Sequence, residues 1–449
     1  MKTNFIKRYL SWYQRFQISK SPQMNLVWGF FLYTLVGFVL LSIPIFHQKD
    51  ISFIDNLFIS TSAVSTTGLV TINILESYNF FGQLIVMFLF QLGGIGYMTL
   101  TTYFLLFTTK RITHWHNKIM GAEFTLPKSI KIIDFIKSVI VFTIIMELLG
   151  SVGFFFVFDE SGLSGLDRIW YSVFHSVSAF CTAGFGLFND SFMGFQDSIL
   201  ANLVISILAI SGSLGFIVIN DIWYRVSRKS KAISFTTKII VYGFLTLLTL
   251  GTAVIYFLEP SIQSHQHQLG LSFFQAMTAM TTVGFNTLDT GALSVPILLF
   301  VTFLMYVGAS PSGTAGGMKI TTLTAMLSIL KSRLFGQHKI TFLNRVIPLE
   351  RLHVATSTFI LYTILIFFFS FLLTFTETGS FEKILFEVAS ALGTVGLSSG
   401  LTGSLTVYGK VSMIILMFIG RVGVLTFGFA LMMRKREENT GAIEDDLAV

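Results

Sequence analysis

Four short segments decide how this sequence folds. They read Ala63-Val-Ser-Thr-Thr-Gly-Leu69, Ala179-Phe-Cys-Thr-Ala-Gly-Phe185, Ala279-Met-Thr-Thr-Val-Gly-Phe285 and Ala391-Leu-Gly-Thr-Val-Gly-Leu397. Each follows the pattern Ala-x-x-Thr-x-Gly-[Phe/Leu] and lies between two long hydrophobic stretches. Four matches in corresponding positions indicate a fourfold internal repeat, which has to be recognised before any architecture is assigned.

Each segment is preceded by an apolar stretch that is too short to cross a bilayer. These stretches span residues 53–64, 166–180, 270–280 and 381–392, whereas a helix needs about 20 residues to cross the hydrocarbon region. We therefore expect four re-entrant half-helices, each preceded by an outer helix and followed by a loop and an inner helix. The outer helices are expected to begin near Met24, Ile133, Thr236 and Leu352, and the inner helices near Phe80, Ser198, Val295 and Tyr408.

The composition places the chain in a membrane. Of its 449 residues, 53% are hydrophobic and 12% are charged, which is about half the charged share of a soluble domain. The predicted fold class is an all-α integral membrane protein with eight transmembrane helices, in which four pseudo-symmetric helix–pore helix–helix repeats surround a central pore. The predicted parts are an N-terminal segment (1–23), repeats at 24–110, 133–226, 236–331 and 352–433, and a C-terminal tail (434–449).

Basic residues gather in alternate gaps between the hydrophobic stretches. They are concentrated in residues 1–20, 110–131, 225–238 and 331–351, whereas the intervening gaps are mainly acidic. Basic loops stay on the cytoplasmic side of a membrane, so both termini are predicted to be cytoplasmic in a multi-pass protein of the plasma membrane. A net charge of +7 also suits nucleic-acid binding, but the alternating placement favours topology, and no nucleic-acid partner is expected. No small-residue cleavage site follows a short apolar core, so no removable signal peptide is expected.

The four loops are expected to meet at a central axis. Backbone that is neither helical nor part of a closed sheet persists at membrane depth only where it is buried in protein or lines a water-filled cavity. The shared glycine allows backbone angles that turn carbonyl oxygens toward such an axis, where they replace the hydration shell of a monovalent cation. A single Thr-x-Gly could also be an ordinary helix C-cap, but four copies in register favour the pore.

These four motifs resemble those of the Ktr/Trk/HKT superfamily of potassium transporters, in particular the membrane (pore) subunits of bacterial Ktr potassium-uptake systems. The resemblance covers residues 22–431 and implies that the four loops form a selectivity filter with one principal glycine each. Serine at the first glycine position is associated with sodium-selective plant members, so Gly68 implies selectivity for potassium. The implied filter residues are Ser65, Thr66, Thr67, Gly68, Cys181, Thr182, Ala183, Gly184, Thr281, Thr282, Val283, Gly284, Gly393, Thr394, Val395 and Gly396.

The third inner helix is interrupted by a run of small residues. Residues 307–318 read Val-Gly-Ala-Ser-Pro-Ser-Gly-Thr-Ala-Gly-Gly-Met, and such a run with a proline cannot sustain a regular helix. We expect a loop at membrane depth, and the resemblance implies that this loop is the gate. The implied gate residues are Gly308, Ala309, Ser310, Pro311, Ser312, Gly313, Thr314, Ala315, Gly316, Gly317 and Arg421. A phosphate-binding loop is excluded, because Met318 separates Gly317 from Lys319 where that motif requires Gly-Lys.

Two charged residues within the hydrophobic stretches are candidate functional groups. Arg421 lies in the fourth inner helix, where a cation is costly and by default functional. We expect it to bind carbonyl and hydroxyl groups of the broken helix and to add an electrostatic barrier to the pore. A purely structural ion pair with Glu147 or Asp221 is the alternative. Glu387, in the fourth half-helix, is a candidate to raise the local cation concentration at the pore mouth.

The sequence favours a channel-like carrier of potassium over an enzyme. No nucleophile with an adjacent base, no metal cluster and no segment long enough for a nucleotide-binding domain is apparent. No cofactor is expected apart from potassium as the transported ion and sodium as a candidate activator. An obligately sodium-coupled potassium symporter is the nearest alternative, and a membrane scaffold without transport activity is a more distant one. The resemblance implies a homodimer in membrane lipid, docked on a cytosolic ring of nucleotide-binding (RCK-type) regulatory subunits.

Overall fold

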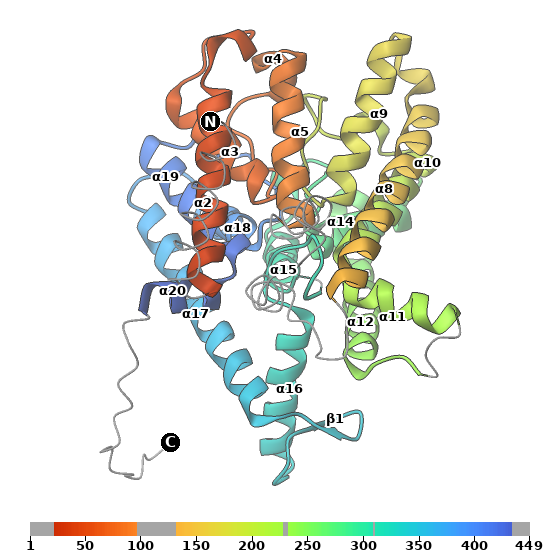
Figure 1. The fold of residues 1–449 in the computed structure, drawn as a ribbon, viewed down its shortest axis with the longest axis vertical. Helices are drawn as coiled ribbons and strands as arrows, with labels where there is room; N and C mark the ends of the chain where they lie inside the picture. The colour runs from red at the N-terminus through yellow and green to blue at the C-terminus, as the bar shows by residue number, and fades with distance from the viewer. Residues whose placement is uncertain (1–21, 97–131, 228–231, 309, 433–449) are drawn as a thin grey trace, which may run out of the picture.

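Helices dominate the part of the chain that this computed structural model describes, residues 22–96, 132–227, 232–308 and 310–432. The first elements are α2 (Pro22–Leu41), η1 (Pro44–Phe46), α3 (Phe53–Val64), α4 (Ile74–Ser77), α5 (Phe80–Ile95), α8 (Ile132–Val157), η2 (Phe158–Ser161), α9 (Gly165–Phe180), η3 (Met193–Phe195), α10 (Ile199–Ser213) and α11 (Phe216–Val226). They are followed by α12 (Phe235–Leu258), α13 (Pro260–Gln263), α14 (Gln268–Thr281), η4 (Thr290–Ala292), α15 (Val295–Tyr306), α16 (Ile320–Leu334), β1 (Thr341–Phe342), β2 (Arg345–Val346), α17 (Leu349–Leu373), α18 (Phe381–Gly393), η5 (Thr402–Ser404), α19 (Val407–Val422) and α20 (Val424–Met432). Figure 1 shows the two strands as a hairpin at the lower end of the molecule, beyond α16.

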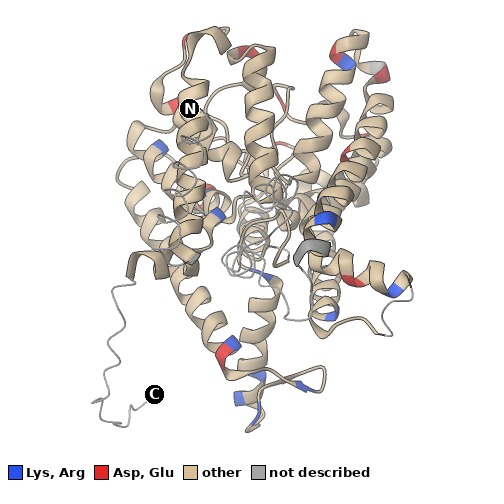
Figure 2. Ribbon diagram, in the orientation of Figure 1, with Lys and Arg blue, Asp and Glu red and all other residues tan. Residues whose placement is uncertain are grey.

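Among the described residues, four helices are long and apolar enough to cross a membrane, and each of them opens one of the predicted repeats. These spans, of 19 to 25 residues, lie in α2, α8, α12 and α17. Many of their large apolar side chains are exposed, for example Leu148 and Phe367, which is the arrangement expected where lipid is the solvent. Figure 2 shows few charges along the middle of the molecule, with most acidic residues toward the end that carries α4 and most basic residues toward the end that carries α16.

The stretches expected to be re-entrant form four short helices, each held between the outer and the inner helix that flank it in the chain. Helices α3, α9, α14 and α18 have 12, 16, 14 and 13 residues. In each repeat this half-helix packs between the preceding outer helix and the following inner helix: α3 between α2 and α5, α9 between α8 and α10, α14 between α12 and α15, and α18 between α17 and α19. The same packing thus recurs four times along the chain.

The inner helices are more broken than the sequence led us to expect. We expected a break only in the third, and α15 does end at Tyr306, with 13 residues between it and the start of α16 at Ile320. The second and fourth, however, also turn, by 94° between α10 and α11 and by 96° between α19 and α20. Both turns fall at a glycine with positive φ, Gly215 (86°) and Gly423 (93°), a conformation that ends helices because side-chain-bearing residues adopt it at a cost. If each bent pair is one span, the described residues contain up to six spans, and the eight crossings stay a prediction.

Candidate functional site

The glycines of the four repeated motifs form a closed ring. Each one abuts the carbonyl oxygen of the residue that precedes the glycine of the next repeat. A Cβ atom added to any of them would lie 2.1 to 2.5 Å from that oxygen; the contacts are Gly68 with Ala183, Gly184 with Val283, Gly284 with Val395, and Gly396 with Thr67. The last contact returns to the first loop, so the structure brings all four predicted loops together around one centre.

The four loops share one backbone conformation. In each, the threonine two positions before the glycine has a φ of 49° to 57°, and the glycine has a φ of 67° to 93°; the threonines are Thr66, Thr182, Thr282 and Thr394. A β-branched residue at positive φ is strained and persists only where its surroundings hold it there. Alternating handedness along a short segment makes successive peptide units point the same way, with N–H groups on one side and carbonyl groups on the other.

The carbonyl oxygens that precede the glycines are free to bind a cation. The N–H groups of Thr67, Ala183 and Val395 donate back to their own half-helices over 2.8 Å. Within the described ranges of the chain, no donor bonds to the carbonyl oxygens of these residues or of Val283. All sixteen predicted filter residues are buried except Gly184 and Gly396, which are partly exposed. Buried and unsatisfied carbonyl oxygens in a ring are the ligands that a dehydrated monovalent cation requires.

The predicted gate loop, between α15 and α16, docks on the threonines of this ring. The hydroxyl of Thr314 lies 3.1 Å from that of Thr182, and the N–H of Gly316 donates to Thr282 Oγ1 over 3.1 Å. A Cβ on Gly316 would lie 1.9 Å from Thr394 Oγ1. The loop is therefore in contact with three of the four motifs at once.

Two further contacts hold the loop in place. The carbonyl of Ser312 accepts from the N–H of Phe216, over 3.0 Å, at the break between α10 and α11. The ammonium of Lys319 donates to the carbonyls of Ala315 (2.7 Å) and Gly316 (2.9 Å). Sequence reasoning did not predict that Lys319 holds this loop, because it weighed the lysine only as part of a phosphate-binding motif. Of the predicted gate residues, Ala309 lies outside the described residues.

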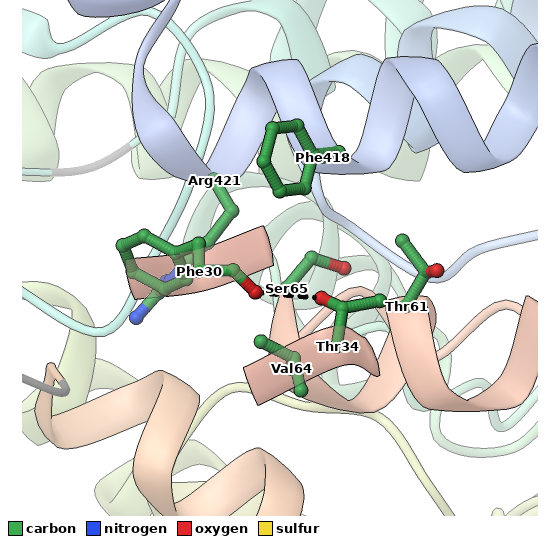
Figure 3. A pocket seen from close by; sticks show the side chains of 7 residues that line it. All are labelled: Phe30, Thr34, Thr61, Val64, Ser65, Phe418 and Arg421. Atoms are coloured by element: carbon green, nitrogen blue, oxygen red, sulfur yellow. Dashed lines mark hydrogen bonds between the residues drawn. The ribbon is translucent and has the colours of Figure 1, made fainter. Parts of the chain in front are cut away.

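Arg421 joins the gate loop to the first motif. Its Nη1 donates to Thr66 Oγ1 over 3.0 Å and to the carbonyl of Thr314 over 2.5 Å. Its Nη2 donates to the carbonyl of Gly93 in α5. Of these partners only the Thr314 carbonyl belongs to the broken helix, where the sequence led us to expect all of them; the hydroxyl comes from Thr66 of the first motif and the other carbonyl from α5. Arg421 also lines a small pocket between α2, α3 and α19, where Figure 3 shows it with Phe30 and Phe418.

A larger cavity of ≈ 730 Å³ adjoins the loop. Its lining includes loop residues 311–313 and 315–317, both Lys319 and Arg421, and parts of α2, α12, α16, α17 and α20. The loop thus contacts the ring of motifs and also lines this cavity.

Glu387 lies in α18 with a fully buried side chain. Its carboxylate accepts hydrogen bonds from the segment that follows Gly396, among them one of 2.8 Å from the N–H of Ser399. The sequence made this acid a candidate to raise the cation concentration at the pore mouth, and that role stays a prediction.

Comparison with known proteins places these features in a family. The TrkH family, described as cation transport proteins, matches residues 32–439. Ktr system potassium uptake protein B of Bacillus subtilis is 35% identical over 418 residues, covering 91% of this chain and 93% of the relative. The potassium/sodium uptake protein NtpJ of Enterococcus hirae is also 35% identical, over 427 residues, covering 92% of this chain and 93% of the relative.

A solved structure has the same fold. The crystal structure of the potassium transporter TrkH from Vibrio parahaemolyticus matches with a TM-score of 0.73 and covers 92% of this chain and 86% of that chain. The two sequences are 19% identical, so this likeness concerns the fold alone.

Proposed function

The chain belongs to the TrkH family of cation transport proteins, and from this premise we propose that it takes up potassium through a channel-like pore. In this proposal the four motif loops are the selectivity filter and the loop between α15 and α16 is the gate. The two relatives are named for potassium uptake and for potassium/sodium uptake, which supports potassium as the transported ion. The family is one of transport proteins, so the chain is not an enzyme.

One observation carries the proposal: the closed ring in which each motif glycine abuts the carbonyl oxygen before the next. A dehydrated cation needs oxygen ligands on all sides to replace its water, and only a ring contributed by all four loops supplies them. A scaffold protein without transport activity has no use for such a ring or for strained threonines beside it. An inside-negative potential of 100 mV contributes about 2.3 kcal/mol per unit charge, which is enough to drive uptake without chemistry.

The gate part of the proposal rests on contacts. The loop is hydrogen-bonded to Thr182, Thr282 and Arg421, so it lies across the threonine end of the filter. The positive charges of Arg421 and Lys319 beside it oppose the passage of a cation. To open the pore, the loop has to move away from the threonines. The side chains of Arg421 and Lys319 have to move with it, or their charges have to be screened.

The wider assembly is proposed on the family resemblance and on charge. We place eight crossings and four repeats in the plasma membrane, with both termini cytoplasmic. The relatives named as parts of a Ktr system support a separate regulatory subunit; the homodimer and the cytosolic ring of nucleotide-binding (RCK-type) subunits rest on the family resemblance. The basic cytoplasmic segments around α16 are the candidate docking surface, and sodium is a candidate activator.

The test is uptake by purified protein in vesicles at fixed voltage, with and without sodium, after rescue of potassium-uptake-deficient cells has shown that the chain is active. Potassium flux that persists without sodium is the expected result. Flux that strictly requires sodium would favour the sodium-coupled symporter. An absence of flux, and of rescue when a regulatory subunit is co-expressed, would favour the scaffold.

A further inference from the structure

One position behind the filter loops differs in chemistry among the four repeats. It lies nine residues before each motif glycine, within the half-helix, and all four side chains at this position are fully buried: Ile59, His175, Gln275 and Glu387. An apolar residue is the usual occupant of such a place. A histidine and a carboxylate there require a reason.

Glu387 is the acceptor for a dense set of donors. Its Oε1 accepts from Ser398 Oγ (2.7 Å), from the N–H (2.8 Å) and Oγ (3.1 Å) of Ser399, and from the N–H of Leu401 (3.3 Å). Its Oε2 accepts from Thr402 Oγ1 over 2.5 Å. All five donors belong to the segment immediately after the fourth filter loop. A carboxylate, which has only acceptor sites, satisfies them together.

His175 makes the equivalent contact in the second repeat. Its Nε2 lies 3.1 Å from the N–H of Leu187, and its Nδ1 lies 2.8 Å from the carbonyl of Tyr171. Because the Leu187 amide can only donate, Nε2 must be the acceptor and Nδ1 must carry the proton. Leu187 is three residues after Gly184, just as Ser399 is three residues after Gly396. The ring of His175 is fixed further by stacking on Phe188, at 5.1 Å between centroids.

The other two repeats lack this contact. Ile59 has no polar atom, and the first loop is instead tied at Thr71, whose hydroxyl donates to Asp55 over 2.7 Å. The amide of Gln275 is buried and, among the residues that the structure describes, neither its oxygen nor its nitrogen has a hydrogen-bond partner. The chain thus offers braced and unbraced versions of one position.

We propose that Glu387 and His175 are positioning residues for cation discrimination, each of which holds the outer end of its own filter loop in register. The proposal rests on the proposed function of the four loops as a filter. Neither side chain belongs to the carbonyl ring, so each acts through the backbone that it holds. A functional constellation has to be held within about 0.5 Å of its working geometry by such supporting groups, and the loops of repeats 2 and 4 alternate around the ring with the two loops that are not held from this position.

The experiment compares potassium-to-sodium permeability ratios of vesicle-reconstituted protein carrying E387L, E387Q or Q275L. E387L leaves two amides and three hydroxyls without their acceptor, and we expect the ratio to fall roughly tenfold. E387Q keeps a carbonyl oxygen for the Ser399 and Leu401 amides, so most of the ratio should be retained. Q275L, matched in position and burial, should leave the ratio unchanged.

Three results would overturn the proposal: an unchanged ratio in E387L, a loss in Q275L as large as in E387L, or a loss in E387Q as large as in E387L. The last would assign the effect to charge and not to bracing. If E387L does not reach the membrane, H175L replaces it with the same expectation. Gly68→Ser, measured alongside, separates the two proposals: if it leaves the ratio intact the filter itself is refuted, whereas if it lowers the ratio and the brace variants do not, only the braces are refuted.

Discussion

Replacement of Gly68 by serine tests the ring of loops most directly. A Cβ at this position would lie 2.3 Å from the carbonyl oxygen of Ala183 and 3.0 Å from the Cα of Gly184. Both atoms belong to the backbone of the neighbouring loop, so neither can move aside as a flexible side chain would. Serine would also have to adopt a φ of 85°, at a cost of roughly 1–2 kcal/mol. The variant therefore either displaces the second loop or leaves the ring itself.

Displacement of a filter loop should appear as a loss of discrimination. Each 1.4 kcal/mol of differential ion binding corresponds to about a tenfold change, so we expect the potassium-to-sodium permeability ratio of Gly68→Ser to fall by about tenfold or more. The assay is the reversal potential of reconstituted protein under opposing potassium and sodium gradients. The matched control is Gly162→Ser, because Gly162 has a similar φ of 71° but nothing within 4 Å of an added Cβ. Unchanged discrimination in Gly68→Ser, or an equal loss in the control, would refute the reasoning.

Three further predictions concern the gate and the outer ends of the repeats. Arg421→Ala should raise uptake in the absence of a regulatory partner, and so, separately, should deletion of residues 313–316. Each change removes contacts that hold the loop on the threonines. Unchanged potassium flux in both variants would refute the gate. Lys319→Met should raise this basal flux severalfold, since two loop carbonyls lose their donor. The control, Lys331→Met on the exposed part of α16, should leave the flux unchanged. Equal fluxes in the two variants would refute the role of Lys319 in holding the loop. Asp55, at the outer end of α3, is partly desolvated, which by itself raises its pKa. Hydrogen bonds from Lys410 and neighbouring hydroxyls together outweigh this effect, so the pKa lies below the ordinary 3.8. Its contribution to stability is therefore present above pH 3.8 and is lost as the pH falls through the folded-state pKa. Asp55→Asn should cost about 1 kcal/mol at pH 7 and progressively less as the pH falls below 3.8, which thermal unfolding in detergent over this pH range measures. A cost that does not fall with pH would refute the assignment.

The half-helices could be predicted from the sequence because the apolar stretch before each motif is shorter than a membrane crossing. A helix of 12 to 16 residues cannot cross a layer that needs about 20, and α3, α9, α14 and α18 occupy the short stretches read in this way. The breaks at Gly215 and Gly423 were missed, although the signal was present. The inner helices of repeats 1, 2 and 4 end alike, with glycines at 93 and 96, 212 and 215, and 420 and 423. A glycine inside a helix lowers its stability by only about 1 kcal/mol relative to alanine. One such pair of glycines therefore does not predict a turn of 94° or 96°.

Pairing between loops lay beyond the sequence for a different reason. The repeated motif shows that four loops exist, but the contact of Gly68 with Ala183, or of Gly396 with Thr67, depends on how four helical units assemble. The same holds for Glu387, whose donors become neighbours only once the chain has turned back along α18. A carboxylate next to serines and a threonine in sequence is compatible with an exposed acid or with a buried acceptor. Only tertiary packing distinguishes the two.

In the mechanism that we propose, the motif threonines connect selectivity and gating in one structural element. Their positive φ belongs to the alternation that aligns the carbonyl oxygens, and their hydroxyls meet the loop or Arg421. A strained β-branched residue keeps such a conformation only while its surroundings enforce it, and here part of those surroundings is the gate. Loop release and ion binding therefore act on the same four dihedral angles. By linkage, if a bound ion stabilises one position of the loop, the same coupling free energy changes the affinity for the ion when the loop moves to its other position. A filter built this way, with one principal glycine in each loop, has no rigid part that is independent of its gate.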